Sequence, residues 1–311
     1  MTQVAQLYKC SPEQFETFRS ELNEFDDDKI YENVKKIQDW VQTQPHLPQN
    51  YDKRILAQFI RGCKHDLERV KRKLNVYFLM RAETPELFGN RDTKNPLIQQ
   101  CLTRCTIVTF PFTTPDGYRI TYFAAPKDVD QFDIVALYKV ILMIADIRMI
   151  EDEFIRGDIF IFNSEGVSGK IVTKVMTPLT KKMLTAAQEA FPQRLASIHV
   201  INTNVFGEKT LNFFKMFVKA TMKNRFHCHS KLDTLYEHVP RSCLPEDLGG
   251  EVESLDKLRA AWKAKIESYA PYFQEQESIH TDRDKISSKD ELIQNEDMFG
   301  TEGSFRQLKI D

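Results

Sequence analysis

Several features that often reveal what a protein does are missing from this 311-residue chain. Its first ten residues contain no apolar core of a secretory signal peptide. No stretch approaches 18 uncharged apolar residues, because charged side chains at Lys139, Asp146 and Arg148 interrupt the longest apolar region, residues 134–150. We therefore expect a cytoplasmic protein without a transmembrane helix.

Cysteine is too sparse to form a disulfide framework. Six cysteines are scattered along the chain without a CxxC pair, so we expect reduced thiols. The formal net charge of −2 gives no overall attraction to nucleic acid, and we predict no nucleic-acid partner. The charge is uneven, since residues 53–73 carry eight Lys or Arg and two acids, whereas residues 274–311 carry ten acids and five bases.

Motifs for catalysis and metal binding are weak or absent. Residues 166–170, GVSGK, have the wrong spacing for a P-loop or for a G-x-S-x-G nucleophile elbow, so we interpret them as a turn that opens a helix. His227 and His229 would share one face of a strand, and only Cys243 lies near enough in the sequence to add a metal ligand. We predict structural histidines, no metal, no cofactor and no catalytic residues.

The sequence patterns predict an α/β fold that begins with an all-helical bundle. Ser11 before Pro12 and Asp66 before an apolar-periodic run are typical helix starts within the helical region, residues 12–81. Alternation of strands and helices then indicates a mixed sheet. The predicted strands are 106–112, 118–123, 158–162, 195–201 and 235–239, and the predicted helices between and after them are 134–151, 170–190, 206–222 and 255–269. We expect three parts: residues 1–90, 91–273 and a loose acidic tail, 274–311.

The most informative stretch is residues 206–218, FGEKTLNFFKMFV. On a helix its apolar positions form one stripe, which is lined by Phe206, Thr210, Phe213, Phe214, Phe217 and Val218. Burying each phenylalanine stabilises the fold by roughly 1.5–3 kcal/mol, so this stripe needs cover. Basic residues lie nearby, and together with apolar side chains they suit an anionic lipid surface. The pattern alone leaves a core, a ligand and a membrane open as the cover.

Three further segments carry a family resemblance. Residues 59–66, FIRGCKHD, resemble an FLRAR-K-F-D hallmark in which Cys63 replaces the second arginine. Residues 191–202, FPQRLASIHVIN, and residues 244–255, LPEDLGGEVESL, resemble two more motifs in the same order. All three are typical of the CRAL-TRIO (Sec14-like) lipid-binding family, in particular its tocopherol transfer and retinaldehyde-binding branch. The resemblance covers about residues 28–273, and the closing GSFRQLKID is similar to the tails of insect members.

The resemblance implies a sheet floor, helical walls around one apolar pocket, and a mobile lid helix. The implied pocket residues are Ile141, Leu142, Ala145, Phe160, Phe162, Met183, Ala186, Ala187, Leu195 and Ile198. The implied lid residues, which would also face the membrane, are Phe206, Thr210, Leu211, Phe213, Phe214, Phe217 and Val218. The implied phosphoinositide-binding residues are Arg61, Arg194, Lys219, Lys223 and Arg225, while Thr221 stands where a lysine is expected.

The resemblance therefore implies a monomeric carrier with no enzymatic activity. It would bind a small hydrophobic ligand and release it at phosphoinositide-containing membranes, with which it would associate transiently. The ligand would be a tocopherol, retinoid, carotenoid or other terpenoid, although Ile141 and Ala145 supply no hydroxyl where the tocopherol branch has small polar residues. The alternatives are a phosphatidylinositol or phospholipid transfer protein, a phosphoinositide-reading adaptor that uses the acidic tail, and a hydrolase.

Overall fold

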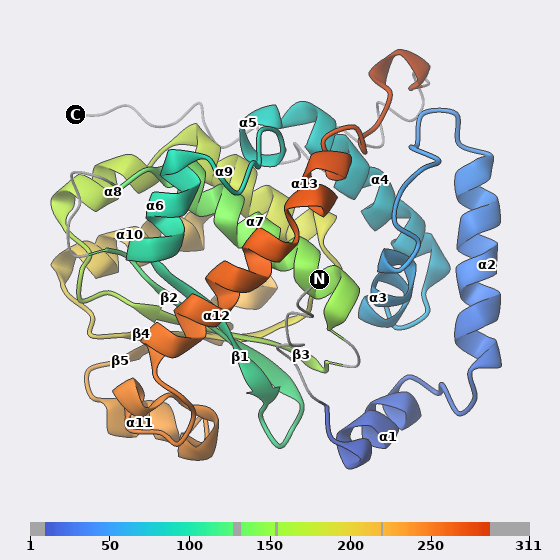
Figure 1. The fold of residues 1–311 in the computed structure, drawn as a ribbon. Coiled ribbons are helices and arrows are strands. Elements are labelled where there is room, and N and C mark those ends of the chain that lie inside the picture. The colour runs from blue at the N-terminus through green and yellow to red at the C-terminus, as the bar shows by residue number, and fades with distance from the viewer. Residues whose placement is uncertain (1–9, 127–131, 153–154, 219, 287–311) are drawn as a thin grey trace.

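The computed structural model describes residues 10–126, 132–152, 155–218 and 220–286, and it has a mixed α/β fold (Figure 1). A helical N-terminal region lies beside a five-stranded sheet that is packed against helices (Figure 1). The predicted fold class is confirmed.

The N-terminal region consists of α1 (Pro12–Glu21), α2 (Asp28–Gln42), α3 (Ile55–Gly62), α4 (Leu67–Glu83) and the short α5 (Pro85–Phe88). Two of their starts were predicted from capping residues. The Ser11 hydroxyl accepts a hydrogen bond from the backbone of Gln14, whose side chain accepts one from the Ser11 backbone, which forms a capping box. The Asp66 carboxylate accepts one from the Arg69 backbone. Both caps are therefore confirmed.

A buried ion triad joins this region to α7 (Ile134–Glu151). The Asp146 carboxylate accepts hydrogen bonds from Arg81 at 2.8 Å and from Arg91 at 2.7 Å, and all three side chains are buried. Side chains of α7 also enter the same hydrophobic core as Phe59 and Phe78 of the helical region. Because a buried charge that loses its partner is costly, this triad fixes where the bundle sits.

The sheet has the order β1-β2-β3-β4-β5. Its strands are β1 (Thr106–Thr113), β2 (Tyr118–Ala124), β3 (Gly157–Asn163), β4 (Leu195–Ile201) and β5 (Phe226–His229). The first pair is an antiparallel hairpin whose turn places Gly117 at a φ of 82°, and the later pairs are parallel. The predicted hairpin and the predicted strands at 158–162 and 195–201 are confirmed.

Alternation along β3 and β4 separates two faces of the sheet. On one face, Ile159, Ile161 and Ile201 enter the main core with Trp262 of α12 (Leu255–Ser268). On the other face, a separate small cluster contains Phe160, Phe162, Leu195, Ile198, Val200 and Phe226 together with Leu211. We call these seven residues the chamber cluster.

The predicted helix 170–190 is wrong as a single element. The structure has α8 (Gly169–Val175), α9 (Pro178–Thr185) and a π-helical segment, Ala186–Ala190. Thr177 is extended, because a residue before proline avoids the helical conformation and Pro178 has no N–H to donate. The π-helical segment is stabilised from α4, since the Lys73 ammonium donates to the carbonyls of Gln188, Glu189 and Phe191.

The order of elements after β4 also differs from the prediction. Helix α10 (Val205–Phe217) ends earlier than residue 222, and a 3₁₀ segment (Ala220–Arg225) leads into β5. The predicted strand at 235–239 is wrong, because residues there belong to α11 (Leu232–Tyr236), which buries Leu235. The five-residue segment LYEHV is too short for its periodicity to distinguish a strand from a short buried helix.

The C-terminal elements close the fold. Helix α13 (Ala270–Gln276) follows α12, and 3₁₀ turns cover Arg241–Cys243, Glu246–Leu248 and Arg283–Lys285. The remaining helix, α6 (Pro96–Arg104), lies earlier in the chain, directly before β1. At the second glycine of LPEDLGG, a Cβ would lie 2.0 Å from the Leu244 carbonyl, so only glycine fits at Gly250. The first residues of the predicted loose tail dock instead, because Ile279 is buried and the Thr281 backbone donates to Phe78. Residues 287–311 lie outside the described residues, and so do Phe299, Phe305 and Leu308.

No helix in the described part of the chain combines the length and the apolar character that a membrane span requires.

Candidate functional site

The chamber cluster presents an aromatic surface on the sheet. Phe123 of β2 stacks on Phe162 with 4.7 Å between ring centroids, and its ring meets the Phe160 ring edge-on at 5.5 Å. Phe160 and Phe162 are only half-buried, whereas their strand neighbours Ile159 and Ile161 on the opposite face are buried. Apolar surface on this face is therefore not fully covered by the protein itself.

Helix α10 lies over this surface. Asn204 caps its N-terminus by accepting from the Gly207 backbone, and Leu211 points into the chamber cluster. The closest approach is at Gly207, where a Cβ would stand 2.7 Å from the Ser164 side chain in the loop after β3. The helix also packs on α8 and α9. Its N-terminal end is thereby fixed to the loop that follows the strand.

The phenylalanines of α10 are placed on two sides. Phe214 is half-buried against the main core, and the Phe213 and Phe217 rings meet edge-on at 5.0 Å, also half-buried. Thr210 and Val218 are half-buried, and Phe206 at the start of the helix is 41% exposed. The buried side chain of the helix is Leu211, which the stripe of the sequence analysis did not contain. Val205 and Met216 add exposed apolar area, with 66% and 61% of their surface accessible.

None of the predicted wall residues on the helices belongs to the chamber cluster. Ile141 is half-buried between the main core and the bundle core, and Ala145 packs against the bundle core. The structure buries three others, Leu142, Met183 and Ala186, within the core that the bundle shares with α7 and α9. Ala187 is exposed. The contacts of these three buried residues support packing between helices, so our proposal below does not place them against a ligand.

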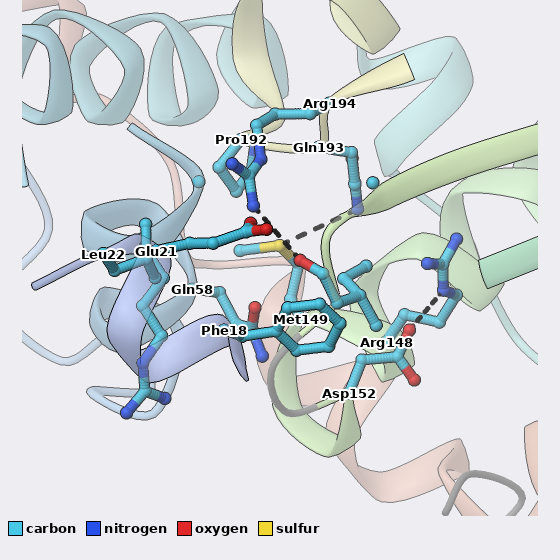
Figure 2. Close-up of a pocket in the computed structure, with 14 residues that line it drawn as sticks. Phe18, Glu21, Leu22, Gln58, Arg148, Met149, Asp152, Pro192, Gln193 and Arg194 are labelled. Atoms are coloured by element: carbon cyan, nitrogen blue, oxygen red, sulfur yellow. Dashed lines mark hydrogen bonds and ion pairs between the residues drawn. The ribbon is translucent and has the colours of Figure 1, made fainter. Parts of the chain in front are cut away.

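Two of the predicted cationic residues share a small pocket. Arg61 of α3 and Arg194, just before β4, both line it, and Glu21 of α1 extends into the same space (Figure 2). Arg194 donates to the Ile155 carbonyl at 3.2 Å, and burial lowers the pKa of its guanidinium. Arg225 donates to the backbone carbonyl of Leu195, the residue after Arg194, but does not line this pocket.

Arg61 is already paired within the chain. Its guanidinium donates to both oxygens of Glu24, at 2.6 and 3.1–3.2 Å, and Glu24 is fully buried. Burial alone would raise the pKa of Glu24, but hydrogen bonds with His65 and Arg61 outweigh it and lower the pKa to about 2. This partner was missed from the sequence, because 37 residues separate Glu24 from Arg61. Lys223 is exposed, and Lys219 lies outside the described residues.

The remaining motifs have structural surroundings. Residues 166–170 form the turn before α8, and the Phe206 ring lies 3.3 Å from where a Cβ of Gly169 would be. His227 and His229 do share one face of β5, where their rings stack with or lie beside that of His199. Cys243 is remote from them, since its thiol donates to the Thr113 carbonyl. Among the described residues, no group of three or more histidine, cysteine or acidic side chains is arranged to hold a metal ion.

Comparison with known proteins agrees with this architecture. Residues 104–250, which span the sheet, α10 and the GG turn, match the family described as CRAL/TRIO domain. Residues 26–98, which span most of the helical region, match the family described as Pinta-like, UBA domain.

Similar proteins cover most of the chain. The human alpha-tocopherol transfer protein-like protein is 27% identical over 255 residues, which is 80% of this chain and 72% of that protein. Clavesin-1 of Xenopus laevis is 25% identical over 254 residues, which is 79% of this chain and 75% of that protein. The crystal structure of Sfh5, at 14% identity, superposes with a TM-score of 0.47 over 80% of this chain and 99% of that one. The family match over residues 104–250, together with these relatives, shows that this chain contains a CRAL/TRIO domain.

Proposed function

We propose that this protein is a carrier that holds one small hydrophobic molecule between the chamber cluster and α10. The observation that carries the proposal is the incomplete burial of Phe160 and Phe162 on the face of the sheet that α10 covers, where the helix contributes Leu211 to the same cluster. Covering apolar surface yields about 25 cal/mol per Å², so a ligand here would gain affinity from contacts that the protein leaves unmade. No covalent chemistry is part of the proposal.

The ligand class follows from the lining. The side chains of the chamber cluster are hydrocarbon. A tocopherol, retinoid, carotenoid or other terpenoid fits such a lining, and the name of the tocopherol transfer-like relatives supports this class. Because none of these side chains supplies a hydroxyl, we expect binding by apolar contact more than by hydrogen bonds.

Extraction of the purified protein into organic solvent, followed by mass spectrometry, tests the carrier proposal. One small terpenoid or related apolar molecule, in stoichiometric amount, is the expected result. A bound phospholipid would instead indicate a phosphatidylinositol or phospholipid transfer protein. Protein without any bound lipid, even after incubation with lipid extracts, would overturn the carrier and favour an adaptor.

We propose further that the protein, as a cytoplasmic monomer, releases its ligand at membranes that contain phosphoinositides. Exposed Val205, Phe206 and Met216 on α10 give the lid an apolar outer surface that could enter a lipid interface. Arg194, Lys223 and Arg225 would contribute attraction to anionic headgroups, and Lys219 stays a prediction for the same role. We expect this attraction to be weak, because Glu24 neutralises Arg61.

Vesicle sedimentation with and without phosphatidylinositol bisphosphate tests the docking proposal. The wild-type protein should bind the bisphosphate vesicles more strongly, and Arg194→Ala combined with Arg225→Ala should remove most of this preference. Equal binding of both proteins to both kinds of vesicle would contradict it.

A further inference from the structure

Four histidines meet at the edge of the sheet, on the face opposite the chamber cluster. His199 lies on β4, His227 and His229 lie on β5, and His238 follows α11. The His199 ring stacks on those of His227 and His229 with centroids 5.0 and 5.1 Å apart. The His238 ring lies 4.6 to 5.7 Å from the other three. We call these four side chains the histidine cluster.

One hydrogen-bond chain runs through the two buried members. It connects Ser197 Oγ to His199 Nε2 at 2.8 Å, His199 Nδ1 to His229 Nε2 at 2.9 Å, and His229 Nδ1 to Thr234 Oγ1 at 2.9 Å. Thr234 donates its own hydroxyl proton to the Lys231 carbonyl, so it accepts from His229. His229 Nε2 is then an acceptor and His199 Nδ1 a donor, which leaves His199 Nε2 to accept from Ser197.

This chain has its hydrogen bonds in the order described when both histidines are neutral. One added proton fits only if His199 changes tautomer and Ser197 reverses to accept, and a second would set the N–H groups of His199 and His229 against each other. Both ring nitrogens of His199 and His229 already have partners. The arrangement is thus sensitive to protons.

The charged surroundings offer little compensation for added protons. His199 and His229 are buried, and the groups that act on their charge are the other histidines and Glu237, an exposed acid beside His238 that favours protonation of His229. Burial, followed by repulsion from the other three histidines, lowers the pKa of His199 to about 3. Burial and His238 also lower the pKa of both His227 and His229. His238 is exposed and His227 half-buried, so water reaches the cluster.

The opposite face of β5 closes the proposed ligand site. Phe226 is paired in register with Ile198 and packs in the chamber cluster, while His227 is paired with His199 on the histidine face. The Lys215 ammonium of α10 lies 5.3 Å from the centre of the Phe226 ring. Strand β5 therefore contacts the histidine cluster on one side and the lid and chamber on the other.

We propose that the histidine cluster is an acid-sensitive latch. Its protonation releases β5 from β4 and opens the proposed ligand site between the chamber cluster and α10. The release of a ligand by this latch rests on the proposed carrier function, whereas the opening of β5 does not. Once β5 is released, His199, His227 and His229 regain an ordinary pKa of about 6.5, above that of the closed state, so the latch holds above that pH and weakens as pH falls. At pH 5, His199 alone would favour opening by about 30-fold.

Hydrogen–deuterium exchange of the ligand-free protein tests the latch. After correction for intrinsic exchange rates, amides of β5 should exchange at least about 30-fold faster at pH 5 than at pH 7.5, while those of β3 should change little. His199→Gln combined with His229→Gln should flatten this pH dependence. Should that variant fail to fold, His227→Gln with His238→Gln, which changes the two accessible members, should reduce it. An acid effect on β5 that is no larger than that on β3, or one that is equal in wild type and variant, would overturn the proposal.

Retinol fluorescence separates this inference from the carrier function. Retinol that is bound at pH 7.5 and lost at pH 5, without vesicles, supports both. If retinol and other terpenoids never bind while β5 still opens in acid, the carrier proposal fails and the latch stands. If bound retinol is retained equally at both pH values by the wild type, release by the latch is wrong.

Discussion

The two faces of β3 are built from similar side chains and are treated differently by the fold. Ile159 and Ile161 are buried in the main core, whereas Phe160 and Phe162, which alternate with them, remain half-exposed under α10. A fold that buried both faces would gain stability from the phenylalanines. We propose that a bound ligand covers the second face, and three substitutions can test this difference between the faces.

The largest loss of stability is expected on the core face. Ile161→Ala removes buried methyl groups and leaves a cavity, which should lower the free energy of unfolding by about 2–5 kcal/mol. Urea denaturation followed by circular dichroism measures this value. A loss below about 1 kcal/mol would show that the two faces do not differ in packing.

An intermediate loss is expected on the chamber face. Phe162→Ala should cost about 1–2 kcal/mol, less than the roughly 3–5 kcal/mol of a fully buried phenylalanine, because its ring is half-exposed, although the change also removes its stacking on Phe123. The same change should weaken terpenoid binding by about tenfold, which Ile161→Ala should not do in its folded fraction. Titration with retinol, monitored by fluorescence, measures the affinity. A stability loss as large as that of Ile161→Ala, with unchanged affinity, would make this face ordinary core.

The smallest effect on stability is expected on the outside of the lid. Met216→Ser changes an exposed residue of α10, so the free energy of unfolding should stay within about 0.5 kcal/mol of the wild type. Binding to vesicles should nevertheless fall severalfold, because the side chain no longer enters the lipid interface. Phe112→Ser, at an exposed phenylalanine on β1, is the matched control and should leave vesicle binding unchanged. Equal loss in both variants would show that lid exposure has no special role.

Much of the fold could be predicted because its signals are local. Helix caps at Ser11 and Asp66 and the hairpin turn at Gly117 each depend on neighbouring residues. The break at Pro178 had a local signal too, which the longer helical pattern concealed. The helix at Leu235 had no local signal, because whether so short a segment forms a strand or a helix depends on what packs against it.

The sites depend on contacts between distant segments, so the sequence showed them only in part. His227 and His229 could be placed on one face by spacing, but His199 and His238 join them only through the pairing of β4 with β5 and the position of α11. Likewise, the basic residues could be named, but not the acid Glu24 that neutralises Arg61. The lid itself was assigned by family resemblance, since its stripe alone was compatible with a core.

Ligand transfer by a lid variant, measured beside its stability, tests the central claim most directly. Phe213→Asp combined with Phe217→Asp places two charges on the half-buried side of α10. If α10 is a lid over a ligand, transfer of retinol to vesicles should fall by more than tenfold while the melting temperature drops by only a few degrees. If transfer and folding are lost together, α10 is part of the core and the account of it as a lid is wrong.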